Sequence, residues 1–385
     1  MKIVSVVGAR PNFMKIAPFI RAIDSYNLHN KSRKIEHVLV HTGQHYDARM
    51  SNAFFNELGI PEPEINLEIG SGTHAEQVGY TMISFEKILR EIQPDWVVVV
   101  GDVNATLACS VTAKKELIKC CHIEAGLRSG DLGMPEEINR LVTDKLSDLL
   151  LTPDVISSEN LRKEGVLENK IVFVGNIMID TLEYNKDKAC NLKFKDILIT
   201  NVIEENVKKL DFFEKIDKYG LITMHRPSNV DNKLIFTLII NWLIFEASNK
   251  IPLIWPIHPR TVKQAQKFGL WEKLINAENL LLLYPIGYLE MLKLNMNAKL
   301  MLTDSGGLQE ECCVLGTPFL TLRWNTERPI TLLEYGGAGY LVGNNIDNIR
   351  RDFDKILKED RMPKRPELWD GNTAERCLEA IFKYN

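Results

Sequence analysis

Residues 302–311 read Leu302-Thr-Asp-Ser-Gly-Gly-Leu-Gln-Glu-Glu311, and Gly316-Thr-Pro318 follows them closely. The apolar run in front, the small residues and the glycine behind predict a strand, a tight turn and a helix. A helix that begins at such a turn presents free N–H groups and a positive dipole end, which suit a diphosphate. Ser305, Gly306 and Gly307 are therefore candidate ligands of a nucleotide, and a tight turn without a ligand is the alternative.

The two acids at the end of this stretch differ in their expected surroundings. On a helix, Glu311 flanks the face that carries the apolar side chains, whereas Glu310 points away from it. We expect Glu311 to accept hydrogen bonds from ribose hydroxyls and Glu310 to be solvated.

Short apolar runs of strand length recur along the whole chain, with longer amphipathic segments between them. This alternation is the βαβ pattern of parallel sheets. The runs cover residues 2–8, 37–42, 96–101, 120–124, 148–152 and 171–174 in the first half, and 220–224, 252–257, 279–285, 299–303, 318–322 and 340–342 in the second. Their even division predicts an α/β protein with two Rossmann-like domains facing a cleft.

The domain boundary is expected in a stretch rich in Lys, Asn and Glu, residues 185–218, which has no strand run. A chain of 385 residues also exceeds what one core usually supports. We predict an N-terminal domain over 1–184, a C-terminal domain over 185–365, and a helix over 366–385 that packs back on the N-terminal domain.

The composition excludes several classes of function. With 45% hydrophobic and 25% charged residues and a net charge of −4, the chain is typical of globular proteins and has no general attraction for nucleic acid or anionic lipid. No stretch has the length of a membrane span, and the short apolar N-terminus is typical of a first strand, so we expect a cytoplasmic protein. Seven cysteines without a Cys-x-x-Cys spacing and eight scattered histidines predict no metal site.

Two cations follow the first strand run. Arg10 and Lys15 lie at the predicted start of a helix, where a phosphate would find both full charges and free N–H groups. The alternative is a strand–helix turn with two solvated cations.

Two acids follow consecutive strand runs. Asp102 comes directly after the third run and Glu124 ends the fourth. Parallel strands end at the same edge of a sheet, so these carboxylates would point into one crevice, where like charge and burial adjust a pKa for proton transfer. Either acid alone is more often a helix cap or a turn residue.

The segment after residue 134 predicts a helix with Glu136 and Arg140 on one face. By pattern alone these two form a solvated ion pair, unless their face lines the cleft. The opposite face is expected to be an apolar stripe of Ile138, Leu141, Val142, Leu146 and Leu149.

The second half adds two histidines and a cation beyond strand runs. His225 and His258 each end an apolar run, and Arg328 follows the next to last run. Two histidines at the same sheet edge favour contact with a ligand over a purely structural role.

At these residues the chain resembles the non-hydrolysing UDP-N-acetylglucosamine 2-epimerase family over nearly its whole length. The motifs that carry the resemblance are Gly8-Ala-Arg-Pro, His41-Thr-Gly-Gln-His45, Gly101-Asp102, His122-Ile-Glu-Ala-Gly-Leu-Arg128, Met134-Pro-Glu-Glu-Ile-Asn-Arg140, Thr303-Asp-Ser-Gly-Gly-Leu-Gln-Glu-Glu311 and Thr326-Glu-Arg-Pro329. The resemblance implies a glycosyltransferase-B-like fold, a homodimer, a UDP-sugar substrate and no cofactor or metal. It also implies a role in making precursors of surface polysaccharides.

The implied reaction inverts C2 of a UDP-2-acetamido sugar, most simply converting UDP-N-acetylglucosamine to UDP-N-acetylmannosamine. Elimination of UDP leaves 2-acetamidoglucal. A proton then returns to the other face of C2, and UDP adds back. The resemblance assigns acid/base chemistry to Asp102, Glu124 and Glu136, charge support to Arg140, His225 and Lys15, and nucleotide contacts to Arg10, Lys15, Ser305, Gly306, Gly307, Glu311 and Arg328. His258 joins the substrate contacts.

The chain departs from the family pattern at several positions. Ala9 and Asn12 replace the frequent Thr and Glu, and Ile286 and Met291 replace the Gln and Phe found near the uracil in many members. Alternative functions are a hydrolysing epimerase that releases UDP and N-acetylmannosamine, and a 2-epimerase of a modified sugar such as a diacetamido uronic acid. A glycosyltransferase and a noncatalytic nucleotide-sugar sensor are the remaining alternatives.

Overall fold

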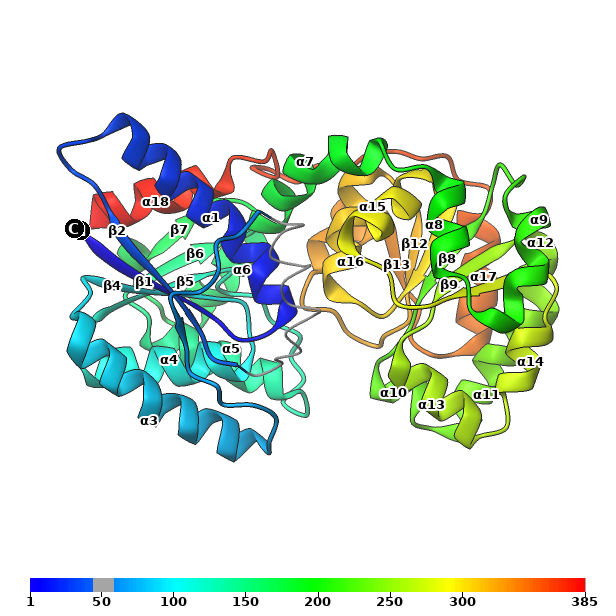
Figure 1. The fold of residues 1–385 in the computed structure, drawn as a ribbon, viewed down its shortest axis with the longest axis horizontal. Helices are drawn as coiled ribbons and strands as arrows, with labels where there is room; N and C mark the ends of the chain where they lie inside the picture. Colours follow the sequence, from blue (N-terminus) through cyan, green and yellow to red (C-terminus); the bar gives the residue numbers. More distant parts are fainter. Residues whose placement is uncertain (44–58, 385) are drawn as a thin grey trace. The chain divides into compact units, whose positions relative to one another are not determined.

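The computed structural model describes residues 1–43 and 59–384. They fall into two compact units: unit 1 comprises Met1–Tyr184 and Glu367–Asn385, and unit 2 comprises Asn185–Pro366. Each unit is built on one parallel sheet with helices on both faces (Figure 1). The predicted α/β class with two parallel sheets is confirmed.

The unit 1 sheet has the strand order β3-β2-β1-β4-β5-β6-β7. All strands are parallel, but the chain adds β2 and β3 on one side of β1 and then β4 to β7 on the other side. The loops after β1 and β4 therefore meet at the point where open α/β sheets bind ligands. The strands are β1 (Lys2–Val7), β2 (Glu36–His41), β3 (Ile65–Asn66), β4 (Trp96–Val100), β5 (Lys119–Ile123), β6 (Leu149–Thr152) and β7 (Ile171–Phe173). The helices are α1 (Arg10–His29), α3 (His74–Ile92), α4 (Asn104–Lys115), α5 (Pro135–Leu146), α6 (Val155–Lys163), α7 (Ile177–Cys190), which runs into unit 2, and α18 (Thr373–Tyr384).

The unit 2 sheet has the order β10-β9-β8-β11-β12-β13, with the corresponding change of side between β8 and β11. The strands are β8 (Gly220–Thr223), β9 (Leu253–Pro256), β10 (Leu280–Leu283), β11 (Leu300–Thr303), β12 (Phe319–Thr321) and β13 (Gly339–Leu341). The helices are α8 (Phe194–Asn201), α9 (Leu210–Phe213), α10 (Pro227–Val230), α11 (Lys233–Trp242), α12 (Ser248–Lys250), α13 (Pro259–Lys267), α14 (Trp271–Asn276), α15 (Tyr288–Asn297), α16 (Gly306–Leu315) and α17 (Ile346–Ile356).

The central strands are buried on both faces, which is why they are continuous apolar runs in the sequence. All five residues of β4 are buried, as are all four of β10. Side chains of β1 and β4 pack with Phe85 and Leu89 of α3 to form a core on one face of the first sheet. Among the described residues, no helix combines the length and apolar character that crossing a membrane requires.

The last helix of the chain, α18, belongs to unit 1 and lies beside α1 (Figure 1). Asp180 on α7 accepts hydrogen bonds from the first N–H groups of α18, those of Thr373 at 3.1 Å and Ala374 at 2.7 Å. Cys377 and Ile381, both on α18, are fully buried. The helix therefore completes the core of a unit whose strands lie far earlier in the chain.

Helix α5 buries its polar face, whereas the sequence predicted that its apolar face would be buried. Its expected apolar stripe is partly exposed, since Ile138 is 48% and Val142 36% accessible. Leu149 lies in β6 rather than on the helix. The buried face consists instead of Glu137, Asn139, Arg140, Thr143 and Asp144. The helix lies against the polar loops that follow β4 and β5, and side chains that satisfy those loops are the ones it buries.

Candidate active site

A buried ion pair lies at the carboxyl end of the first sheet. Lys15 of α1 pairs with the Glu124 carboxylate after β5, and both side chains are more than nine-tenths buried. Gly101 covers the pair: a Cβ there would lie 3.1 Å from Lys15 Nζ and 3.6 Å from Glu124 Oε2. Its φ of +69° is the left-handed conformation that glycine adopts without strain, and the limited space beside Lys15 also favours glycine.

Asn12 fixes the loop that precedes Lys15. Its Oδ1 accepts hydrogen bonds from the N–H groups of Gly8 and Ala9, and its Nδ2 donates to the Val100 carbonyl at 2.8 Å. The side chain is 2% exposed. Asn12 thus joins the loop after β1 to the end of β4, a function that sequence reasoning missed when it noted this residue only as a departure from the family.

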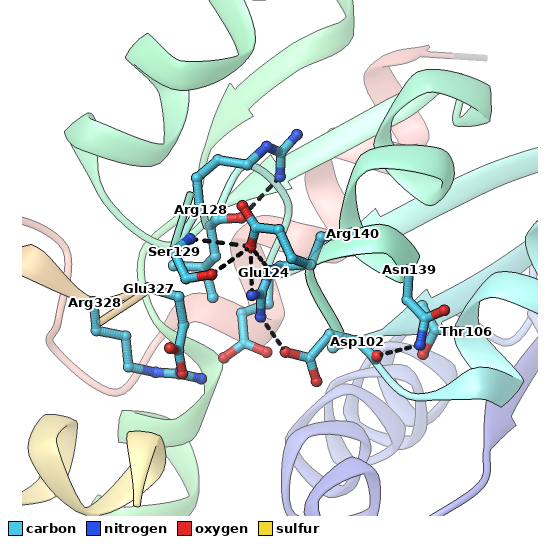
Figure 2. A network of polar contacts seen from close by, with 12 residues as sticks. Asp102, Thr106, Glu124, Arg128, Ser129, Asn139, Arg140, Glu327 and Arg328 are labelled. Carbon is cyan, nitrogen blue, oxygen red and sulfur yellow. Dashed lines mark hydrogen bonds and ion pairs between the residues drawn. The ribbon is translucent and has the colours of Figure 1, made fainter. Parts of the chain in front are cut away.

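Asp102 is held by Arg140 rather than left free after the strand. Arg140 NH1 lies 2.5 Å from Asp102 Oδ2 (Figure 2). Arg140 NH2 lies 2.6 Å from Glu137 Oε2. Asn139 also donates to the Asp102 carbonyl at 2.9 Å. The guanidinium is buried, but the Asp102 side chain remains 24% exposed. Arg140 therefore presents an accessible carboxylate at the sheet edge.

Glu137, for which the sequence predicted no role, is the buried anchor of Arg140. It also accepts hydrogen bonds from the N–H groups of Ser129 and Gly130, each at 3.0 Å. Burial alone would raise the pKa of Glu137, but those N–H groups and Arg140 stabilise its charge and hold the pKa below its ordinary value. The expected pairing of Arg140 with Glu136 is wrong, since Glu137 takes that place.

Glu136 is half-buried in the first turn of α5. Its side chain has no hydrogen-bond or ion-pair partner among the residues that the structure describes. We refer to Lys15, Asp102, Glu124, Glu137 and Arg140 as the unit 1 site. Glu136 is a neighbour of this site in the chain and is not part of its hydrogen-bonded network.

Some of the predicted site residues in this region lie outside what the structure describes. Arg10 is the first residue of α1, but its side chain lies outside what the structure describes, as do Gln44 and His45 of the second motif. His41 of that motif is buried against Phe13, with ring centroids 5.2 Å apart. Burial lowers the pKa of His41 to about 4, so this ring is neutral at pH 7.

In unit 2 the loop after β8 is organised by Asp304, which follows β11 and is fully buried. Its carboxylate accepts hydrogen bonds from the N–H groups of His225, at 2.9 Å, and Arg226, at 2.8 Å. His225 Nδ1 lies 3.2 Å from the other oxygen. Burial opposes the charge on Asp304, but His225 and these N–H groups outweigh it, and the pKa is lowered. Asp304 thus orients a half-exposed imidazole.

The structure brings the two predicted histidines together. The rings of His225 and His258 lie 5.2 Å apart. Burial, with a smaller contribution from His225, lowers the pKa of His258. His258 Nδ1 accepts a hydrogen bond from the Arg260 N–H at the start of α13, so its other ring nitrogen is the one that can meet a ligand.

Helix α16 begins directly after Ser305, and its first residue lies beneath a guanidinium. A Cβ on Gly306 would lie 2.6 Å from both Arg328 NH1 and Glu327 Oε1, so any larger residue would displace these two side chains. Arg328 also lies 2.8 Å from Glu310 Oε1, with both side chains buried. The expectation that Glu310 is solvated is wrong: its helix face meets the loop that carries Arg328.

Glu311 is buried beside the apolar core, on the face that the helical projection predicted. Burial and the nearby charge of Glu310 raise its pKa to about 8, against an opposing interaction with Tyr288. Its Oε2 atom has no hydrogen-bond partner among the described residues. His225, Asp304, Glu310, Glu311 and Arg328 are referred to below as the unit 2 site.

Among residues 1–43 and 59–384, no three His, Cys, Asp or Glu side chains are grouped so as to hold a metal ion. The unit 1 site instead combines carboxylates with cations that touch them, as proton transfer and developing negative charge require. The unit 2 site combines a helix N-terminus, a buried cation and a carboxylate oxygen that no described residue contacts by a hydrogen bond.

A protein family described as UDP-N-acetylglucosamine 2-epimerase matches residues 27–382. The UDP-N-acetylglucosamine 2-epimerase of Methanocaldococcus jannaschii is 42% identical over 99% of both chains. The UDP-2,3-diacetamido-2,3-dideoxy-D-glucuronate 2-epimerase of Pseudomonas aeruginosa is 37% identical over the full length of both.

Solved structures show the same similarity. A crystal structure of the Methanocaldococcus jannaschii UDP-GlcNAc 2-epimerase, in complex with UDP-GlcNAc and UDP, has a TM-score of 0.85 at 41% identity and covers 100% of both chains. The lipopolysaccharide outer core galactosyltransferase WaaB is 14% identical with a TM-score of 0.52, which is a likeness of fold alone.

Proposed function

This chain belongs to the UDP-N-acetylglucosamine 2-epimerase family, and on that premise we propose that it interconverts UDP-N-acetylglucosamine and UDP-N-acetylmannosamine without releasing UDP. The observation that carries the proposal is the unit 1 site, in which Asp102 and Glu124 each touch a buried cation at the switch point of a parallel sheet. Inversion of a weakly acidic C2–H needs acid and base groups on both faces of the sugar.

The reaction balances as an elimination and a re-addition. A carboxylate takes the proton from C2, the C1–O bond to UDP breaks, and 2-acetamidoglucal is left. A proton then returns to C2 on the other face while a UDP oxygen forms the C1–O bond again. Asp102, Glu124 and Glu136 are the proposed proton carriers, and Arg140, Lys15 and His225 stabilise the charges that develop.

The unit 2 site is the proposed binding site of the nucleotide. The N–H groups at Gly306 and Gly307 and the cation of Arg328 suit a diphosphate. The Oε2 atom of Glu311 is buried without a hydrogen-bond partner in the described part of the chain, and a ribose hydroxyl would satisfy it. The proposed contacts in this unit are His225, His258, Ser305, Gly306, Gly307, Glu311 and Arg328, and those in unit 1 are Arg10 and Lys15.

Incubation with UDP-N-acetylglucosamine in deuterated water tests the proposal. We expect deuterium at C2 in both epimers and no accumulation of UDP. Free UDP in equal amount to N-acetylmannosamine would identify a hydrolysing enzyme, and tight binding without exchange would identify a sensor. Transfer of the sugar to an added acceptor would identify a glycosyltransferase.

A modified sugar is the second candidate substrate. The Pseudomonas aeruginosa relative acts on a diacetamido uronate, and it aligns with this chain from end to end. Ile286 and Met291 occupy the positions at which many members have the Gln and Phe near the uracil. The same exchange assay with UDP-2,3-diacetamido-2,3-dideoxyglucuronate discriminates: a higher kcat/KM for that sugar than for UDP-N-acetylglucosamine would favour it.

We also propose a cytoplasmic homodimer that serves the synthesis of surface polysaccharide precursors. Support for self-association comes from exposed apolar side chains on α3 and α5, the two helices that pack on α4. They are Tyr80, Ile83, Ile138 and Val142, with 58%, 57%, 48% and 36% exposure. Light scattering of wild type and Ile83→Glu tests this: the wild type should have twice the mass of the variant.

A further inference from the structure

A fully buried carboxylate, Asp144 on α5, lies beneath the loops that carry Asp102 and Glu124. We propose that Asp144 is a positioning residue, which holds these two loops in register through His122 and through the backbone after Glu124. The inference rests on the proposed epimerase function, because it concerns the two carboxylates to which that function assigns proton transfer.

The first contact runs through His122 to the loop after β4. Asp144 Oδ1 lies 2.6 Å from His122 Nδ1, and His122 Nε2 lies 2.8 Å from the Gly101 carbonyl oxygen. A carbonyl oxygen only accepts, so Nε2 donates to it. The imidazole is completely buried and joins Asp144 to the residue immediately before Asp102.

The second contact runs directly to the loop after β5. Asp144 Oδ2 accepts a hydrogen bond from the Gly126 N–H at 3.0 Å and lies 2.7 Å from Arg128 NH1. Glu124, two residues earlier, has a φ of +74°, a left-handed conformation that costs energy for a side chain of this kind. Such a backbone persists only where its surroundings fix it, and the Gly126 contact is one of those that do.

The three partners of Asp144 among the described residues are all donors, so this position requires a carboxylate rather than an amide. The His122 Nδ1–H, the Gly126 N–H and the Arg128 guanidinium each require an acceptor. An amide in place of the carboxylate would turn an NH2 group toward one of these donors. Asp144→Asn therefore disturbs the two loops with almost no change in side-chain volume.

Asp148 supplies a matched control. It also pairs with a cation, Lys114 at 2.7 Å, and also accepts from a backbone N–H, that of Cys120 at 2.8 Å. It precedes β6, however, and lies at the end of the sheet opposite the unit 1 site. A general effect of losing a buried or half-buried carboxylate would appear in both variants.

We expect Asp144→Asn to lower kcat for epimerisation, and C2 exchange with it, by about 10- to 100-fold, because a small displacement of acid/base groups has effects of this size. KM and the affinity for UDP should stay within about twofold of wild type, and Asp148→Asn should match wild type in all of these. Equal kcat in Asp144→Asn and wild type, or an equal loss in both variants, would overturn the proposal.

A readout that does not depend on the reaction separates this inference from the proposed function. By hydrogen exchange and mass spectrometry, Asp144→Asn should accelerate amide exchange in peptides covering 101–104 and 122–128, and Asp148→Asn should not. Unchanged exchange there would overturn the positioning role, whichever reaction the wild type catalyses. If Asp144→Asn does not fold, His122→Gln takes its place: the amide still donates toward Gly101 but loses Asp144, and the same two losses are expected.

Discussion

The guanidinium of Arg140 joins the carboxylate of Asp102 to a buried framework, with Arg140 NH1 and Asp102 Oδ2 2.5 Å apart. Arg140 is 1% exposed, whereas a quarter of the Asp102 side chain is accessible. A carboxylate that is fixed on one side and open on the other can exchange a proton with a substrate without moving. Arg140 also compensates the negative charge that this group carries between proton transfers.

Asp102→Asn should reduce deuterium incorporation at C2 by at least about 100-fold, because acid/base groups contribute 10²–10⁴-fold to such steps. The amide still accepts from Arg140 through its oxygen, so the fold and the affinity for UDP should be retained. Exchange is measured by NMR and UDP affinity by calorimetry. A rate within tenfold of wild type would remove Asp102 from the proton-transfer group.

The adjacent acids Glu136 and Glu137 should respond differently to the same substitution. Glu136→Gln should abolish exchange without changing stability, since its side chain has no partner among the described residues. Glu137→Gln should instead destabilise the protein by about 1–3 kcal/mol, because it weakens the hydrogen bonds that a buried carboxylate accepts. Urea unfolding and the exchange assay on both variants check this, and equal stabilities would contradict the assigned contacts.

Lys15→Met should destabilise unit 1 by about 3–5 kcal/mol, because it leaves Glu124 buried without its cation. The double variant Lys15→Met/Glu124→Gln also removes the buried charge that has lost Lys15, and it should recover most of this loss. The free energy of unfolding, measured with urea, gives both quantities. A double variant less stable than Lys15→Met would show that the charge on Glu124 is not what destabilises the single variant.

Glu311 should make the stability depend on pH. Its pKa is about 8 in the folded protein and near 4.5 when unfolded, so the folded form keeps a proton that the unfolded chain loses. The stabilisation is complete below pH 4.5 and is lost as the pH rises to about 8. Relative to Glu311→Gln, which does not titrate there, wild type should lose up to about 1.4 kcal/mol per pH unit over this range. Parallel stabilities of the two proteins at pH 5, 6.5 and 8 would contradict the raised pKa.

The sequence predicted the sheets well because strands buried on both faces are uninterrupted apolar runs, whatever else the chain does. Helix α5 was mispredicted for a related reason: its buried face is polar, and a polar face is interpreted as solvated unless the loops that it meets are known. The prediction that Glu310 is solvated was wrong for the same reason. Its partner Arg328 lies 18 positions later in the chain, beyond a strand, so the local sequence does not show the contact. The spacing of apolar residues predicts which apolar side chains are buried. It does not predict buried polar side chains, and these two sites consist of such side chains.

Unit 2 is inserted into unit 1, since α18 returns to the sheet begun at the N-terminus. During translation, all of unit 2 emerges from the ribosome before the final element of unit 1. The unit encoded in the middle can thus reach its native state first, while the one begun first lacks the helix that Asp180 caps until residues 373–384 have emerged. A chain truncated before residue 373 would therefore contain all of unit 2 but lack the last helix of unit 1.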